Sequence, residues 1–284
     1  MKNVMIIGKD SYIGEAIFLW LKQYPDLYNT DIISPLNYEW KKIDYSKYDT
    51  VVNLTGIAHI MNITNDMKML FYSVNRDLIV EIGKYVKKHG VHHFIHFSSM
   101  NVYGDFCHIV TNQSAENPTS FYGDSKLQGD IELKKLNDHL FSISIVRPPF
   151  VYGKNCKGNY NTIKKIAQKI PVFPTYRNKK SMIYIDNLCE FIRLIIEDGS
   201  GGIYTPQNRE LVSTGDLVRE IASVHGKKIW YTSIFNWLIP FGMKLSRIMK
   251  KAFINDSYAL ELSNDYNFEY CVVDFKTSIR RTET

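Results

Sequence analysis

The chain has 284 residues, of which 45% are hydrophobic and 23% charged, and its formal net charge is +6. This length suits one large domain or two small ones, and the apolar fraction is large enough for a core, which excludes wholesale disorder. The basic excess looks dispersed, so it fits a small anionic ligand. It is too diffuse to predict a face that binds nucleic acid.

No targeting or membrane-spanning segment is visible. The first three residues lead directly into the apolar run Val4–Ile7, which is typical of a strand, and no run of about 18 apolar residues follows. The cysteines show no CxxC spacing, so we expect neither a metal site nor a disulfide framework; they are Cys107, Cys156, Cys189 and Cys271. We therefore expect a cytoplasmic protein.

Apolar runs alternate with helical patterns along the first 170 residues. We predict strands at Asn3–Ile7, Asp31–Ser34, Thr50–Leu54, His92–Ser98 and Phe141–Arg147. We predict helices at Tyr12–Gln23, Asn65–Lys88, Ser120–Asn137 and Asn159–Lys169. Continuous apolar strands that alternate with helices indicate an α/β fold with a doubly wound parallel sheet. Pro148 and Pro149 would end the fifth strand.

The rest of the chain is less regular. A strand–helix unit recurs at Met182–Glu197, and a helix should begin near Ser213, capped by Ser213 or Thr214. The segment Ser233–Phe253 mixes apolar with basic residues, and Pro240 and Gly242 interrupt it. It could lie on a membrane surface. We favour the interpretation that it forms an oligomer face or a lid on the core.

A glycine turn follows the first predicted strand. Gly8 would allow a tight turn and Gly14 close packing of helix on strand, while Ser11 stands where related turns have a third glycine. The helix N-terminus that follows offers free N–H groups to a pyrophosphate. The pattern predicts a dinucleotide site.

The second strand does not settle which dinucleotide binds. An acidic residue usually ends this strand and binds the adenosine ribose, but here it ends in Ser34-Pro35-Leu36-Asn37. Ser34 with Lys41 or Lys42 could tolerate a 2′-phosphate, so NAD and NADP both stay open. Asp44 could contact the adenine or could cap a turn.

A tyrosine and a lysine four residues apart, Tyr122 and Lys126, would share one face of the fourth helix. Bringing a tyrosine pKa from about 10 to near 7 costs about 4 kcal/mol. A lysine cation about 5 Å away supplies about 3 kcal/mol at an effective dielectric constant of 20. Such a pair, helped by the charge of an oxidised nicotinamide, can form a general base. Ser99, at the end of a central strand, could share the proton.

Six ordered motifs resemble those of the extended short-chain dehydrogenase/reductase superfamily, in its NAD-dependent nucleotide-sugar epimerase/dehydratase branch. The motifs are Gly8–Gly14, Asn53–His59, Tyr72–Asn75, Ser98–Gly104 with Tyr122–Lys126, Arg147–Gly153 and Met182–Asp186. The resemblance implies a Rossmann-type NAD(P)-binding domain over 1–150, to which 182–205 return. It also implies a smaller substrate-binding α/β subdomain, mainly over 151–284.

The resemblance further implies roles for matching residues. Catalysis would rest on Ser99, Tyr122 and Lys126. The cofactor would be bound by Gly8, Ser11, Tyr12, Ile13, Gly14, Ser34, Asp44, Leu54, Thr55, Gly56, Ala58, Asn75, Tyr122, Lys126 and Pro148. The substrate would be bound by Ser99, Met100, Asn101, Tyr122, Asn159, Val172, Phe173 and Lys180.

One departure bears on the reaction. Dehydratases of this branch carry an Asp-Glu pair where this chain has Met100-Asn101, which argues against dehydration. We expect a UDP-hexose or UDP-N-acetylhexosamine 4-epimerase that uses NAD and forms a homodimer through helices 65–88 and 120–137. An NADPH-dependent reductase of a UDP-4-keto-6-deoxy sugar is the close alternative, and a non-catalytic dinucleotide-binding protein is the third.

Overall fold

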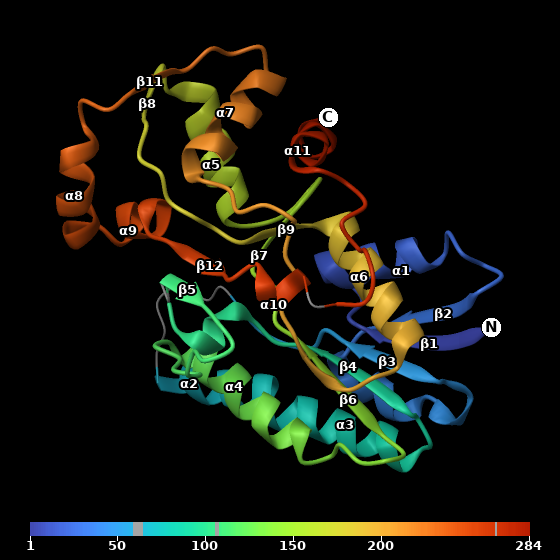
Figure 1. Cartoon of the computed structure of the whole chain (residues 1–284). Coiled ribbons are helices and arrows are strands. Elements are labelled where there is room, and N and C mark those ends of the chain that lie inside the picture. The colour runs from blue at the N-terminus through green and yellow to red at the C-terminus, as the bar shows by residue number, and fades with distance from the viewer. Residues whose placement is uncertain (59–64, 106–107, 265) are drawn as a thin grey trace. The chain divides into compact units, whose positions relative to one another are not determined.

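The computed structural model describes residues 1–58, 65–105, 108–264 and 266–284 (Figure 1). The chain divides into two compact units. The first unit comprises Met1–Asp105, Ala115–Pro148 and Leu188–Pro206, and the second comprises Phe106–Ser114, Pro149–Asn187 and Gln207–Thr284. The assignment of the second unit to substrate binding stays a prediction.

The first unit is built on a six-stranded sheet in which every pair of neighbours is parallel. The order is β10-β6-β4-β3-β1-β2, where the strands are β1 (Lys2–Ile7), β2 (Tyr28–Ile33), β3 (Thr50–Asn53), β4 (His93–Phe97), β6 (Ser142–Val146) and β10 (Gly202–Tyr204). The order reverses beside β1, as in a doubly wound fold. The predicted fold class is therefore confirmed.

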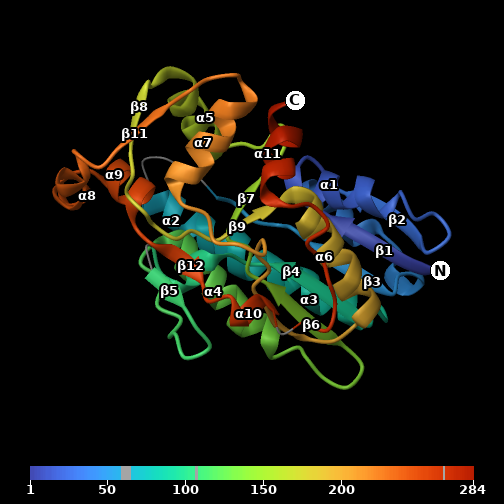
Figure 2. The ribbon, with the colours of Figure 1, turned by 45° about the horizontal axis from the view of Figure 1, so that its top comes forward.

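Helices cover both faces of this sheet because its strands are apolar on both sides. In Figures 1 and 2, α1 (Tyr12–Leu21) and α6 (Ile185–Asp198) lie on one face, and α3 (Ile79–Lys88) and α4 (Phe121–Lys134) lie on the other. Ile82 of α3 and Leu133 of α4 join Val51 and Phe94 of the sheet in one core cluster. This packing fixes α4 over the ends of the central strands.

The predicted helix at 65–88 is helical throughout but not uniform. It consists of α2 (Asn65–Tyr72), a π-helical stretch η3 (Ser73–Leu78) and α3. A π turn widens the helix and is common at functional sites. The pattern of apolar residues does not predict the π-helical stretch, because a π turn differs from an α turn in its backbone hydrogen bonds.

The second unit combines helices with short parallel strand pairs. Its main helices are α5 (Asn159–Lys169), α7 (Thr214–Val224) and α11 (Phe275–Glu283), which lie together in Figure 2. The strand pairs are β5 (His108–Val110) with β12 (Asp256–Tyr258), β7 (Phe150–Tyr152) with β9 (Met182–Tyr184), and β8 (Val172–Pro174) with β11 (Trp230–Thr232). Ser213 caps α7 in a capping box with Asp216, as one of the two predicted caps.

The apolar and basic segment forms η5 (Asn236–Leu238), α8 (Ile239–Leu245) and α9 (Arg247–Phe253), and α10 (Glu261–Asn264) follows. Pro240 does not interrupt α8, because a proline is tolerated in the first turn of a helix. The break instead falls at Ser246, whose extended backbone caps α9. No helix among the described residues is long and apolar enough to cross a membrane.

Candidate active site

The predicted glycine turn links β1 to α1. A Cβ on Gly14 would lie 2.3 Å from the Gly8 carbonyl oxygen, so glycine is required for the helix to approach the strand. A Cβ on Gly8 would lie 2.9 Å from Leu54 Cβ, and the left-handed residue of the turn is another one. That residue is Asp10, with φ of 71°. Ser11 caps α1 by accepting a hydrogen bond from the Gly14 N–H at 2.9 Å.

The side chains after β2 favour a cofactor without a 2′-phosphate. Lys41 pairs with Glu81 at 2.5 Å and lies over the Tyr38 and Trp40 rings, so its charge is already engaged. Asp44 accepts hydrogen bonds from the Ser46 backbone and hydroxyl and caps the short helix η2 (Tyr45–Lys47). Of the two roles left open for Asp44, the structure shows the turn cap.

The loop after β3 is fastened to η3 and α4. The amide of Asn75 in η3 binds both the N–H and the carbonyl of Ile57, at 2.8 and 3.1 Å. A Cβ on Gly56 would lie 2.6 Å from Lys126 Nζ and 3.2 Å from Asn75 Oδ1. The structure therefore brings Gly56, Asn75 and Lys126 together. His59 of the same motif lies outside the described residues.

This part of the first unit fits a dinucleotide. Thr55 is buried, and its hydroxyl has no hydrogen-bond partner among the described residues, as expected of a group that meets a ligand. The Ser11-capped N-terminus of α1, at which Tyr12 and Ile13 begin the helix, offers N–H groups for a pyrophosphate. Gly8, Gly14 and Gly56 let the turn, the helix and the loop after β3 approach one another closely, because a Cβ at any of them would meet neighbouring protein atoms. Leu54 and Ala58 flank Thr55 in the chain.

The predicted catalytic residues come from two neighbouring elements. Ser99 caps η4 (Met100–Tyr103) and donates to Asn101 Oδ1 at 3.0 Å, and Asn101 donates to Asp105 at 2.9 Å. Tyr122, in the first turn of α4, lies beside Ser99, whose hydroxyl acts to lower the pKa of the phenol. The Met100 N–H donates to the Pro148 carbonyl, which holds η4 on the strand end. Tyr122, Ser99 and Asn101 thus form one connected polar group.

A glycine lets the two elements meet. A Cβ on Gly123 would lie 2.4 Å from the Asn101 carbonyl oxygen. Any larger residue at this position would therefore separate Tyr122 from the η4 segment that carries Ser99.

Burial decides the pKa values of Tyr122 and Lys126 in the absence of a cofactor. Burial raises the pKa of Tyr122, although the hydrogen bond to Ser99 opposes the rise. Burial lowers the pKa of Lys126 to about 8, and Lys126 Nζ donates to the Phe97 carbonyl at 2.9 Å. The two side chains alone therefore do not produce a tyrosinate. Desolvation is the largest cause of both shifts.

The sequence interpretation missed the ion pair below these residues. Asp130 and Arg147 are both fully buried, with Arg147 donating to Asp130 Oδ2 at 2.9 and 3.1 Å and Ser98 donating to the same oxygen at 2.8 Å. Burial raises the pKa of Asp130, and Arg147 opposes the rise. Asp130 follows Lys126 by four residues, so helical spacing could have indicated it.

The remaining predicted substrate residues belong to the second unit. Asn159 is the first residue of α5, and Val172 and Phe173 begin β8. The Phe173 ring is buried against Tyr231 and Phe253, so Val172 is the exposed member of that pair. Burial lowers the pKa of Lys180, and Lys251 adds to this while Asp256 opposes it.

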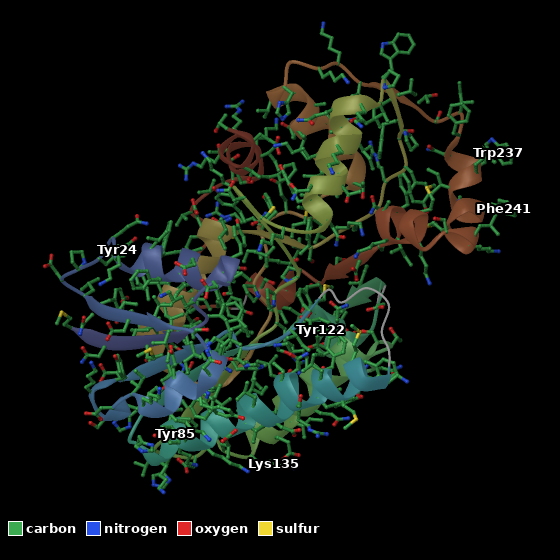
Figure 3. The ribbon with its side chains drawn as sticks, turned by 180° about the vertical axis from the view of Figure 1, so that it is seen from behind. Tyr24, Tyr85, Tyr122, Lys135, Trp237 and Phe241 are labelled. Carbon is green, nitrogen blue, oxygen red and sulfur yellow. The ribbon has the colours of Figure 1, made fainter. Side chains whose placement is uncertain are left out.

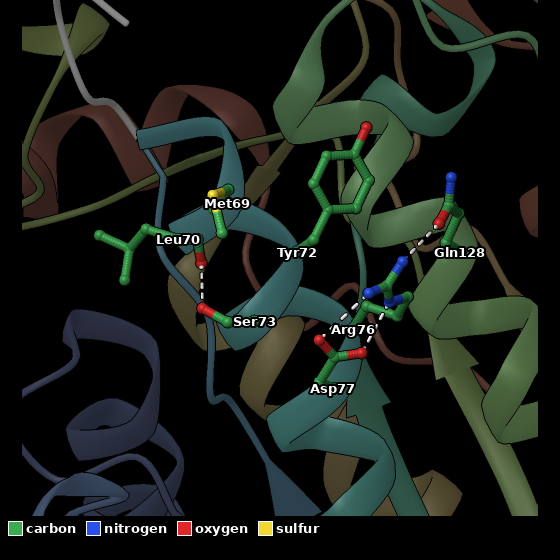
Figure 4. Close-up of a pocket in the computed structure, with 7 residues that line it drawn as sticks. All are labelled: Met69, Leu70, Tyr72, Ser73, Arg76, Asp77 and Gln128. Atoms are coloured by element: carbon green, nitrogen blue, oxygen red, sulfur yellow. Dashed lines mark hydrogen bonds and ion pairs between the residues drawn. The ribbon is translucent and has the colours of Figure 1, made fainter. Parts of the chain in front are cut away.

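An open hollow of about 750 Å³ lies elsewhere in the first unit. Figure 4 shows that α2, η3 and α4 line it through Met69, Leu70, Tyr72, Ser73, Arg76, Asp77 and Gln128. None of these residues is a predicted site residue. The hollow lies on the helices through which we expect a homodimer to form, and that pairing stays a prediction.

Comparison with known proteins agrees with these features. A UDP-glucose 4-epimerase from Vibrio cholerae is 28% identical over 206 residues, which cover 69% of this chain and 62% of that protein. The chain thus spans less than two thirds of that relative. An N-acetyl-alpha-D-glucosaminyl-diphospho-ditrans,octacis-undecaprenol 4-epimerase from Escherichia coli O157:H7 is 30% identical over 248 residues, or 80% of this chain and 73% of that protein.

Solved structures share the fold. UDP-glucuronic acid 4-epimerase from Bacillus cereus, in complex with NAD, is similar with a TM-score of 0.74 at 17% identity, covering 99% of this chain and 95% of that one. The family model described as "NAD dependent epimerase/dehydratase family" matches residues 6–205. The chain therefore belongs to the NAD-dependent epimerase/dehydratase family of enzymes.

Proposed function

We propose that this protein is a 4-epimerase of a diphosphate-linked sugar, with a UDP-hexose or UDP-N-acetylhexosamine as its substrate and NAD as its cofactor. The observation that carries the proposal is the position of Tyr122 beside Ser99, whose hydroxyl favours the ionised form of the phenol, with Lys126 one turn further along α4. A phenol and a hydroxyl that share a proton can receive the proton of a sugar hydroxyl. The names of the relatives support the choice of C4.

In the proposed reaction, Tyr122 Oη takes the proton from the C4 hydroxyl and Ser99 Oγ orients that hydroxyl. Bound NAD would supply the hydride acceptor at C4 and, when oxidised, a positive charge in addition to that of Lys126. Tyr122 would hold the proton while C4 is a ketone and return it to the C4 oxygen at the end of the reaction. Lys126, held by the Phe97 carbonyl, would bind the nicotinamide ribose.

Three observations separate this proposal from its alternatives. Asn101 is bound to Ser99 and Asp105, so an amide stands where a dehydratase needs an acid. Lys41 is paired with Glu81, which weakens the argument for a 2′-phosphate and thus for an NADPH-dependent reductase. Tyr122 and Lys126 are both in place on α4, which weakens the argument for a non-catalytic role.

A second candidate is 4-epimerisation of an N-acetylhexosamine carried on a polyprenyl diphosphate, the substrate class in the name of the Escherichia coli relative. The observation that favours it is the exposed apolar side chains of η5 and α8, where Trp237 and Phe241 are 74% and 62% exposed. The reaction at C4 and the residues that perform it would be the same.

The test uses the purified protein without added cofactor. We expect it to interconvert UDP-glucose and UDP-galactose, or their N-acetylamino counterparts, and to release NAD on denaturation. Tyr122→Phe should lower the rate by about 10²- to 10⁴-fold, because it removes the proton acceptor. Tyr85→Phe, which removes a phenol that donates to the Lys41 carbonyl, is the matched control and should leave the rate unchanged.

Two results would contradict the proposal. Net consumption of NADPH with a 4-keto sugar nucleotide would identify a reductase. Full activity of Tyr122→Phe would remove Tyr122 from the mechanism. A protein active only on the polyprenyl-linked sugar would establish the second candidate.

A further inference from the structure

The segment formed by residues 234–251, here called the α8 segment, carries large apolar side chains on its outside. Trp237, Phe241 and Leu245 are 74%, 62% and 73% exposed. They are four residues apart, which places them on one side of a helical segment. Figure 3 shows Trp237 and Phe241 on the side of α8 that faces away from α9. Helices of globular proteins normally bury such a side.

Packing on the opposite side of α8 holds this orientation. Ile239 is buried, and a Cβ on Gly242 would lie 3.2 Å from Met249 Cε of α9. The side of α8 that faces α9 therefore carries small side chains, and the large aromatic side chains lie on the exposed side. Ile234 and Phe235 extend the exposed apolar surface toward the start of the segment. A contiguous apolar patch of this kind marks an interaction site.

The excess positive charge of the chain lies in the stretch of sequence that contains the α8 segment. Residues 221–255 contain no acidic residue and six basic ones, namely Lys227, Lys228, Lys244, Arg247, Lys250 and Lys251. The other 249 residues carry 29 basic and 29 acidic side chains, so this stretch accounts for the whole net charge of +6. The expectation of a dispersed excess was therefore wrong. Lys244, Lys250 and Lys251 are exposed within the α8 segment.

We propose that the α8 segment docks on the surface of an anionic lipid bilayer. Trp237, Phe241 and Leu245 enter the boundary between headgroups and acyl chains, where aromatic side chains are favoured. Lysines near the segment lie against anionic headgroups, to which each basic residue adds attraction within a Debye length. The contact is peripheral. It holds for either class of sugar substrate and does not depend on the proposed reaction.

The charge pattern favours a bilayer over a second copy of the chain. A twofold contact through the α8 segment would bring together two stretches of sequence whose charged residues are all basic. An anionic surface instead supplies counter-charges to all of them at once. Association of two copies through this segment is therefore an outcome that the experiment must be able to detect.

Flotation of the full chain with lipid vesicles tests the proposal. We expect the protein to float with vesicles of mixed phosphatidylcholine and phosphatidylglycerol, and about tenfold less with phosphatidylcholine alone. The double variant Trp237→Ser/Phe241→Ser should reduce flotation about tenfold. Its matched control is Leu19→Ser/Leu140→Ser, which removes two equally exposed apolar side chains of the first unit and should float like the unchanged protein.

A second set of variants tests the charge. Lys244→Gln/Lys250→Gln/Lys251→Gln should lose the preference for phosphatidylglycerol and the weakening of flotation by salt. The control is Lys84→Gln/Lys88→Gln/Lys165→Gln, which changes three exposed lysines elsewhere. It should keep the preference for phosphatidylglycerol and the weakening of flotation by salt.

Several results would overturn the proposal. One is absence of flotation with anionic vesicles, and another is equal loss in the test variants and their controls. A protein that does not float but whose dimer dissociates in Trp237→Ser/Phe241→Ser would use this surface to bind a second copy. The rate on a soluble sugar nucleotide should not change in Trp237→Ser/Phe241→Ser, so failure of docking and failure of the proposed reaction are separately visible.

Discussion

Each unit contains a buried carboxylate that holds several elements together, and the two differ in their access to water. Asp130 of the first unit binds Arg147, and neither side chain is exposed. Glu283 of the second unit has a buried side chain too, but its partners Lys164 and His225 are about one third exposed. Asp130 and its partner Arg147 are both shielded from solvent. Glu283 is buried, but water contacts its partners Lys164 and His225.

The difference shows how burial decides what an ion pair does. In the first unit, Asp130 also accepts from Ser98, next to the candidate catalytic Ser99, so the pair supports the floor of that site. In the second unit, Glu283 joins α11 to α5 and α7 through Tyr160, Lys164 and His225. Burial opposes ionisation of Glu283, but its hydrogen bonds outweigh burial and lower its pKa.

The largest expected effect is that of Asp130→Asn, which leaves the buried Arg147 guanidinium without its main counter-charge. We expect the free energy of unfolding to fall by about 3–5 kcal/mol, measured by urea denaturation at neutral pH. Glu116→Gln removes the other, partly exposed partner of Arg147 and should cost less. If Asp130→Asn lowers the free energy of unfolding by less than about 1 kcal/mol, burial does not make the Asp130–Arg147 pair the stronger of the two.

The next largest effect on stability concerns two glycines, one in α4 of the first unit and one in α7 of the second. A Cβ on Gly129 would lie 2.4 Å from the Asn75 carbonyl oxygen, so Gly129→Ala should cost about 1–3 kcal/mol by forcing α4 away from η3. A Cβ on Gly215 in α7 would meet nothing closer than 3.6 Å. Gly215→Ala is the matched control and should be neutral or slightly stabilising in thermal unfolding.

The pH dependence of Glu283 sharpens the comparison further. Its pKa is lowered from 4.5, so its stabilisation is present above pH 4.5 and is lost as the pH falls through the folded-state pKa. Glu283→Gln should cost about 1–2 kcal/mol at pH 7, and this gap should close as the solution is acidified. Glu269→Gln, in an exposed pair with Arg209, should show no such closing gap. If the stability difference between the unchanged protein and Glu283→Gln stays constant down to low pH, the pKa of Glu283 is not lowered by folding.

The smallest effect concerns the exposed side of the second carboxylate. His225→Gln should lower the free energy of unfolding by about 0.5 kcal/mol, because Lys164 and Tyr160 still bind Glu283. Thermal unfolding measured alongside Glu283→Gln gives the comparison. A loss as large as that of Glu283→Gln would show that His225 is the dominant partner.

The sequence predicts what depends on local pattern. Strands β1, β3, β4 and β6 are within one or two residues of their predicted bounds because each is a continuous apolar run between turn signals. Helix α5 matches its predicted bounds at Asn159 and Lys169. Tyr122 and Lys126 share a helix with the predicted spacing, and Tyr122 meets Ser99 because α4 packs over the end of β4.

What the sequence did not predict depends on contacts between distant residues. The pKa directions of Tyr122 and Lys126 follow from burial, which the spacing of residues does not contain. Lys41 is engaged by Glu81, forty residues further along, and the short strand pairs of the second unit join segments far apart in the chain. Asp130 and the charge balance of residues 221–255 were readable from the sequence but were overlooked.

The π-helical stretch Ser73–Leu78 has a consequence for insertions and deletions. A π turn contains about one residue more than an α turn, so loss of one residue here would restore regular hydrogen bonding. It would also rotate α2 by about 100° against α3. Asn75 would release the two Ile57 groups that it binds, while the strands of the sheet would keep their pairing. Deletion of one residue from Ser73–Leu78 would thus loosen the loop beside Gly56 without disrupting the sheet.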